Sequence, residues 1–128
     1  MGAQGPPHAL PFKGDPIVKQ GETIYEIITK GDGFGFGLAL ARIVQTEPHY
    51  HTLTQELYVV VSGMLDLEIG RFRHSQPELH YKLGTGRAHS IPIRRVHQAS
   101  AYDCKAAWVY VFTFPSFDPA DYHVLRKY

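Results

Sequence analysis

The segment PHYHTLTQELYVVVSG, at residues 48–63, brings together side chain types that bind metals. His49 and His51 are two residues apart, so in an extended strand they point to the same face. If the chain turns at residues 53–55 and returns antiparallel, Glu56 comes back beside them. Two imidazoles and a carboxylate are ligands that first-row transition metals accept. The segment is therefore either an ordinary hairpin or three-quarters of a metal site.

A fourth ligand has to come from elsewhere, and the segment GRAHSIPIRRVH, residues 86–97, offers one. His97 follows an expected turn at residues 93–95 and opens another strand. His89, His80 and His74 are alternatives, but His89 is expected in mid-strand and His74 in a polar connection. His97 is the preferred fourth ligand.

The first of these segments resembles the first motif of the cupin superfamily. That motif is Gly, five residues, His-x-His, three or four residues, Glu, six residues, Gly. His49, His51, Glu56 and Gly63 fit it, while Ile43 stands where the first glycine is expected. All three metal-binding positions of this motif are therefore present.

The second segment resembles the second cupin motif, which is Gly, five residues, Pro-x-Gly, two residues, His, three residues, Asn. Gly86, Pro92 and His97 fit this pattern. Arg94 replaces the second glycine and Ala101 the asparagine. We expect Arg94 to adopt a conformation open to an L-residue, so that its turn differs from that of the family.

The resemblance implies an all-β fold, a small antiparallel β-barrel of the double-stranded β-helix or jelly-roll type. It also implies one divalent metal inside the barrel, bound by His49, His51, Glu56 and His97. Such a set leaves one or two coordination positions open, which is typical of catalytic sites. The ligands do not select among iron, manganese, zinc, nickel and copper.

Two classes of function fit this resemblance. Cupins include isomerases, cyclases, decarboxylases and dioxygenases that act on small organic molecules. Other cupins bind or sense a small ligand without chemistry, and the fold alone does not distinguish the two. We expect a metal-dependent enzyme, with a non-enzymatic binding module as the alternative and a small molecule as the partner in either case.

The expected pocket residues follow from the two motifs. Tyr58 shares the face of Glu56 and is the candidate catalytic and substrate-binding side chain. Arg94 would place a guanidinium near the mouth, where it could meet a carboxylate or phosphate. Ala101 would widen the pocket, and Arg42 is a further candidate for substrate binding. Other polar candidates are Tyr25, Tyr110 and His123.

The remaining sequence predicts the strands that position these residues. Runs rich in Val, Ile, Tyr, Phe and Thr alternate with Gly, Pro, Asp or Ser clusters, which favours an antiparallel sandwich or barrel. Asp118 is expected to cap a short helical turn that begins at Pro119. The predicted strands are 17–19, 22–29, 37–45, 57–61, 64–69, 80–83, 88–91, 96–101 and 106–114.

Length and composition bound the remaining interpretation. Residues 1–15, rich in Gly and Pro, are expected to form a flexible arm, and residues 16–128 a single domain. The formal net charge of +1 gives no sign of a nucleic-acid-binding surface, and we expect neither a membrane span nor a secretory signal.

The single cysteine, Cys104, is expected to be a small buried side chain and favours a cytoplasmic location. The resemblance also implies a homodimer.

Overall fold

The computed structural model describes residues 12–70, 79–102 and 105–125. Most of the expected N-terminal arm, together with His74 and Cys104, lies outside the described residues. The described end of the arm is held against the domain: the Lys13 amide donates to the Glu26 carbonyl oxygen at 2.8 Å. The Phe12 ring also packs on the Tyr25 ring, with their centroids 5.1 Å apart.

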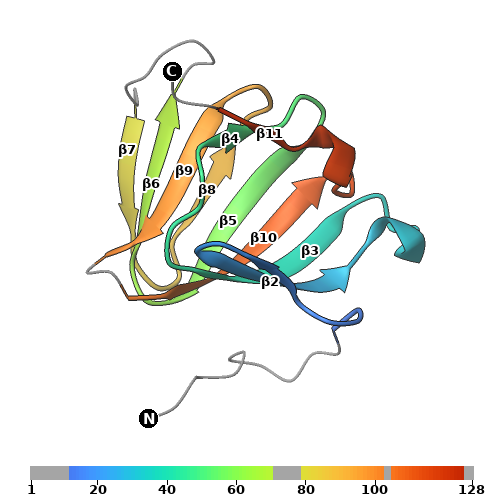
Figure 1. The fold of residues 1–128 in the computed structure, drawn as a ribbon, viewed down its shortest axis with the longest axis horizontal. Coiled ribbons are helices and arrows are strands. Elements are labelled where there is room, and N and C mark those ends of the chain that lie inside the picture. Colours follow the sequence, from blue (N-terminus) through green and yellow to red (C-terminus); the bar gives the residue numbers. More distant parts are fainter. Residues whose placement is uncertain (1–11, 71–78, 103–104, 126–128) are drawn as a thin grey trace.

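Two antiparallel sheets make up the fold, as the predicted jelly roll requires (Figure 1). The first has six strands in the order β1 (Ile17–Lys19), β2 (Glu22–Ile28), β3 (Gly37–Ile43), β10 (Ala107–Phe114), β5 (Gln55–Ser62) and β8 (Ala88–Ile91). The second has five strands in the order β11 (His123–Val124), β4 (His49–Tyr50), β9 (Val96–Ala101), β6 (Leu65–Gly70) and β7 (Leu79–Leu83).

The two sheets are separate ladders, joined where the chain leaves β3 and approaches β9. There Gln45 pairs with Ser100 in an isolated bridge, and the Thr46 amide donates to the Ala99 carbonyl oxygen at 2.8 Å. The predicted barrel is therefore a sandwich of two facing sheets in the described part of the chain.

Every predicted strand is present, with shifts of one or two residues at several ends. Two strands of two residues each, β4 and β11, were not predicted, because so short a strand carries no alternating pattern. The predicted helical turn is the 3₁₀ turn Pro119–Asp121, in which the Asp118 side chain accepts a hydrogen bond from the Ala120 amide. A second 3₁₀ turn spans Lys30–Asp32. No helix in the described residues has the length and apolar character to span a membrane.

The core lies between the two inner faces and follows from strand alternation. In β5 the residues Glu56, Tyr58 and Val60 are buried, whereas the residues between them are partly exposed. Leu65 and Leu67 of β6 face them from the other sheet and are fully buried. The inner face of β5 therefore carries both core residues and one predicted metal ligand.

The hairpin between β1 and β2 depends on Gly21, which has a φ of +80°. The Gly21 carbonyl oxygen accepts the amides of Val44 and Gln45 at 2.8 and 3.0 Å. A side chain at this position would meet the Gln45 carbonyl oxygen, because a Cβ built there lies 2.1 Å from it. Gly21 therefore ties the start of β2 to the β3–β4 connection.

We predict that Gly21→Ala lowers the free energy of unfolding by about 3 kcal/mol, since it adds a steric clash to an unfavourable φ. The matched control is Gly14→Ala, which has a similar φ of +71° but no atom within 4 Å of the new Cβ. It should cost only about 1 kcal/mol. Urea denaturation measures both, and equal losses would show that the close approach to Gln45 is unimportant.

Candidate metal centre

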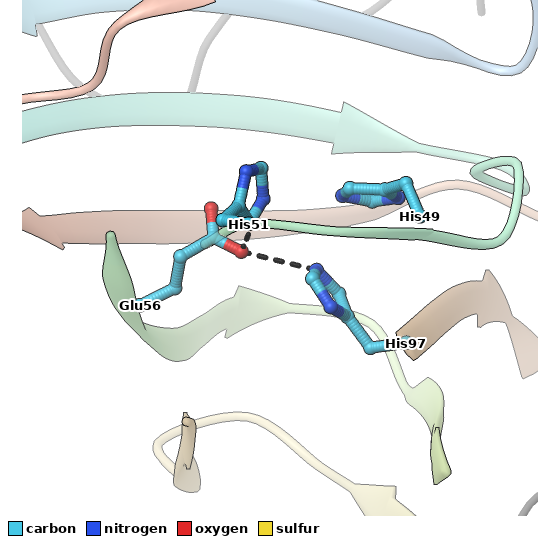
Figure 2. A group of neighbouring side chains, drawn as sticks. All are labelled: His49, His51, Glu56 and His97. Carbon is cyan, nitrogen blue, oxygen red and sulfur yellow. Dashed lines mark ion pairs between the residues drawn. The ribbon is translucent and has the colours of Figure 1, made fainter. Parts of the chain in front are cut away.

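Four buried side chains from three strands and one loop converge inside the sandwich (Figure 2). His49 lies in β4 and pairs with His97 in β9, His51 directly follows β4, and Glu56 lies in β5. Their candidate ligand atoms all lie within 4.8 Å of one another. Glu56 Oε1 is 3.1 Å from His51 Nε2 and 3.0 Å from His97 Nε2. The structure thus brings together the four predicted ligands.

Backbone carbonyl groups set the tautomer of all three histidines. Each Nδ1 contacts a carbonyl oxygen: His49 that of Glu47 at 2.8 Å, His51 that of Asp121 at 2.7 Å, and His97 that of Arg95 at 3.2 Å. A carbonyl oxygen only accepts, so each Nδ1 must carry the hydrogen. In the neutral rings Nε2 then keeps a free lone pair, which is the form that binds a metal.

Several atoms of this group are buried polar atoms without a hydrogen-bond partner in the described part of the chain. They are His51 Nε2, His97 Nε2 and Glu56 Oε1. Leaving such an atom unsatisfied costs about 1–3 kcal/mol. A divalent cation between them would satisfy all three atoms at once, so the residues present fit a metal ion.

Burial and the charges of neighbouring side chains shift the pKa values within this group. Burial alone would raise the pKa of the Glu56 carboxyl, but His51 and His97 beside it hold that pKa well below its usual range. Burial, followed by the nearby His97, lowers the pKa of His49 to about 3. Burial would also lower the pKa of His51, but the Glu56 carboxylate outweighs it and raises that pKa. Glu56 is therefore ionised and His49 neutral at neutral pH.

A cavity of about 250 Å³ opens beside this group. His49, His51 and Glu56 form part of its wall, and most of the remaining wall is apolar, contributed by residues such as Ile24, Leu38, Val111 and Phe117. Three of the four ligand residues therefore border a partly open cavity that could hold a small molecule.

Tyr58 lies where the sequence predicted, on the cavity wall two residues beyond Glu56. Its ring meets the His97 ring edge-on, with centroids 6.1 Å apart. Burial and the neighbouring Glu56 carboxylate raise the pKa of the Tyr58 hydroxyl well above its usual value. Tyr58 is thus a neutral phenol that can donate a hydrogen bond at physiological pH.

The other predicted substrate-binding residues do not line this cavity. Arg42 is exposed because its neighbours in β3, Ala41 and Ile43, point into the core. Ala101 is buried in that core opposite Leu65, four residues beyond His97 along β9. Strand alternation, which placed Tyr58 correctly, sends Arg42 to the outer face.

Arg94 also differs from its prediction. It keeps the turn in a left-handed conformation with a φ of +64°, instead of changing the turn to suit an L-residue. The Arg94 amide donates to the His51 carbonyl oxygen at 2.6 Å, while the side chain is exposed. This backbone hydrogen bond ties the second motif to the first, so Arg94 contributes to the centre through its main chain.

The remaining polar candidates lie outside the cavity wall. Tyr25 and Tyr110 pack with Trp108 in a second apolar cluster, away from the core that contains Tyr58. His123 contacts the Asp121 carboxylate at 3.2 Å and stacks on Tyr50.

Asp121 is a supporting residue that the sequence did not reveal. Its carboxylate accepts hydrogen bonds from the amides of Thr52, Leu53 and Thr54 and from the Thr52 hydroxyl, at 2.6–3.1 Å. Burial would raise the pKa of Asp121, but these bonds hold it well below its usual range. Since the Asp121 carbonyl oxygen also orients His51, one residue fixes both this ligand and the loop leading to Glu56.

We predict that His51→Ala removes metal binding, because it deletes the candidate ligand that lies between His49 and Glu56 in the first motif. The sandwich should stay folded, since the large apolar core is untouched. Elemental analysis of protein grown in metal-replete medium should give about one divalent metal per wild-type chain and none in the variant. Full metal content in the variant would contradict the ligand assignment.

We also predict that Asp121→Asn weakens metal affinity about tenfold to a hundredfold, because an amide cannot accept all the hydrogen bonds of the 52–54 loop. The control is Asp118→Asn, which changes a carboxylate that caps the same 3₁₀ turn but makes no hydrogen bond with the 52–54 loop among the described residues. Competition with a metal chelator measures both affinities. Equal affinities would show that loop anchoring does not support the centre.

Comparisons with known proteins agree with this architecture. No family model matches the sequence, and no curated protein matches it. Among solved structures, the capsular polysaccharide assembling protein CapF from Staphylococcus aureus superposes with a TM-score of 0.74 at 16% identity, over 91% of this chain and 35% of CapF. This chain therefore spans about a third of the length of CapF.

Two shorter proteins match over most of their own length. KdgF from Halomonas sp. gives a TM-score of 0.67 at 18% identity, over 84% of this chain and 93% of KdgF. Ectoine synthase from P. lautus gives 0.67 at 15% identity, over 89% of this chain and 83% of the synthase. The chain has the cupin fold, as its two histidine motifs implied.

Proposed function

We propose that this protein is a metal-dependent enzyme acting on a small organic molecule bound in the cavity beside His49, His51, Glu56 and His97. The observation that carries the proposal is that the ligand group forms part of a cavity wall. A structural metal site is usually closed on all sides by protein, whereas a catalytic site keeps a position open for substrate or water. Some proteins with the same fold, such as ectoine synthase, are enzymes by name.

The proposed division of labour follows from the side chains. A divalent metal held by the four ligands would supply Lewis-acid or redox chemistry to an oxygen-bearing group of the substrate. Tyr58 would donate a hydrogen bond to the same group, since its hydroxyl stays protonated. The apolar wall would hold the carbon skeleton and limit the access of water. Dioxygenase, isomerase and cyclase activities all suit this arrangement.

A binding module without chemistry is the second candidate, favoured by the mainly apolar character of the wall. In either case the partner is a small molecule. A bound metal among iron, manganese, zinc, nickel and copper, a homodimeric state and a cytoplasmic location remain our expectations from the sequence.

The test is a metal-dependent turnover screen. Protein loaded separately with iron, manganese and zinc is incubated with a panel of small hydroxy acids, keto acids and sugar acids, with and without dioxygen. Products are followed by mass spectrometry and dioxygen consumption by electrode. Turnover that requires the metal supports the enzyme, while binding without turnover across the panel supports the module.

For the substrate found, we predict that Tyr58→Phe lowers kcat about tenfold to a hundredfold, as expected for the loss of one hydrogen-bond donor to the reacting group. Metal content and melting temperature should stay close to those of the wild type. The control is Tyr110→Phe, a change in the second apolar cluster that should leave kcat unchanged. Equal kcat values for the wild type, Tyr58→Phe and Tyr110→Phe would show that the Tyr58 hydroxyl takes no part in the reaction.

A further inference from the structure

Glu22 is a cavity residue that neither cupin motif contains. It is the first residue of β2, directly after the hairpin turn at Gly21. Strand alternation places Glu22 on the same face as Ile24 and Glu26, and all three residues line the cavity beside the metal centre. The backbone contacts of Gly21 hold this end of β2 in place.

A second cavity, of about 350 Å³, meets the first at Glu22. Its wall includes Thr46 and Glu47, and it shares Lys19, Glu22 and Tyr122 with the first cavity. Glu22 therefore borders both the cavity beside the metal ligands and the second cavity.

The shared wall is held in a fixed arrangement. Lys19 Nζ lies 3.7 Å from the centre of the Tyr122 ring, and the Tyr122 hydroxyl donates to Glu47 at 3.0 Å. The other side of Tyr122 is occupied by His49, since these two rings stack with centroids 4.5 Å apart. Lys19 thereby contacts an aromatic ring, and it makes no ion pair or hydrogen bond with Glu22 in the described part of the chain.

The surroundings of Glu22 bring its pKa close to neutral pH, so that both its protonated and its ionised form are present there. Burial among cavity-wall atoms raises the pKa of Glu22 to about 7, against the lowering effect of the Lys19 charge. The carboxylates of Glu56 and Glu47 raise this pKa further, and His51 lowers it. A carboxyl group with a pKa near the working pH can both accept and donate protons.

We propose that Glu22 is the proton-transfer group of this cavity, accepting the proton that an acidic ligand loses when it binds at the metal centre. The inference rests on the proposed function, because it requires an open metal site. The balance is simple: an O–H or C–H bond of the ligand breaks, an O–H bond forms on Glu22, and the electron pair stays on the ligand.

Other ionisable cavity groups suit this role less well. Tyr58 stays protonated, so it can donate but cannot accept. Glu56 faces His51 and His97 and would be occupied by the metal. Glu26 lies four residues further along β2 on the same face, and it does not border the second cavity. Glu26 is therefore a matched control for Glu22.

The experiment counts protons with zinc-loaded protein and acetohydroxamic acid, which chelates divalent metals after losing a proton. Isothermal titration calorimetry at pH 7.5, in buffers of different ionisation enthalpy, gives the number of protons released per ligand bound. Wild-type protein should release about half to three-quarters of a proton fewer than Glu22→Gln, because most of the wild-type Glu22 is ionised at pH 7.5 and can capture the proton. Glu26→Gln should behave like the wild type.

Equal proton release by the wild type and Glu22→Gln would overturn the role of Glu22 and leave the proposed function standing. No binding of the hydroxamate to any metal-loaded form would overturn both, since the metal site would then not be open. Zinc content is measured for each variant, and Glu22→Ala repeats the count in case the glutamine variant does not fold.

A ligand-free measurement provides a second readout. Because the pKa of Glu22 is higher in the folded protein than the ordinary value of 4.5, the folded state holds a proton that the unfolded chain loses as pH rises. The melting temperature of the wild type should therefore fall relative to that of Glu22→Gln between pH 5.5 and 7.5. A constant difference over this range would overturn the proposal.

Discussion

The burial of several candidate ligand atoms that have no hydrogen-bond partner among the described residues is the constraint on which this structure depends. His51 Nε2, His97 Nε2 and Glu56 Oε1 face one another in the core, where an unsatisfied polar atom is costly. The protein holds them there by fixing the opposite side of each ring with a backbone carbonyl group. The centre is therefore preorganised by main-chain geometry, which leaves the ring nitrogens directed at one point.

This preorganisation draws on parts of the chain that are distant in sequence. The Asp121 carboxylate accepts hydrogen bonds from the amides of the 52–54 loop. The C-terminal 3₁₀ turn therefore positions the loop that joins His51 to Glu56. The Arg94 amide binds the His51 carbonyl oxygen from the turn before His97. Both contacts converge on His51, which makes this residue the point where the two motifs and the C-terminal segment are joined.

The sequence predicted the ligands because their spacing is a local property of strands and turns. The two-residue alternation also placed Tyr58 on the cavity wall, and the same rule excludes Arg42, since Ala41 and Ile43 are buried. Asp121 and Glu22 were missed because their roles depend on contacts across the fold, with partners 67–69 residues away for Asp121. Arg94 was misjudged because its left-handed backbone is stabilised by a tertiary hydrogen bond to His51, which no local pattern reveals.

Two glutamates show how this fold uses the same side chain for opposite purposes. Glu56 lies between two imidazoles, and their proximity outweighs burial and keeps its carboxylate ionised. Glu22 lines the same cavity, and Lys19 contacts the Tyr122 ring, so burial dominates and raises the pKa of Glu22. Environments that push the pKa values of two carboxyl groups apart allow one to bind a cation while the other exchanges a proton. The separation follows from where β2 and β5 meet the cavity, and it requires no residue type beyond glutamate.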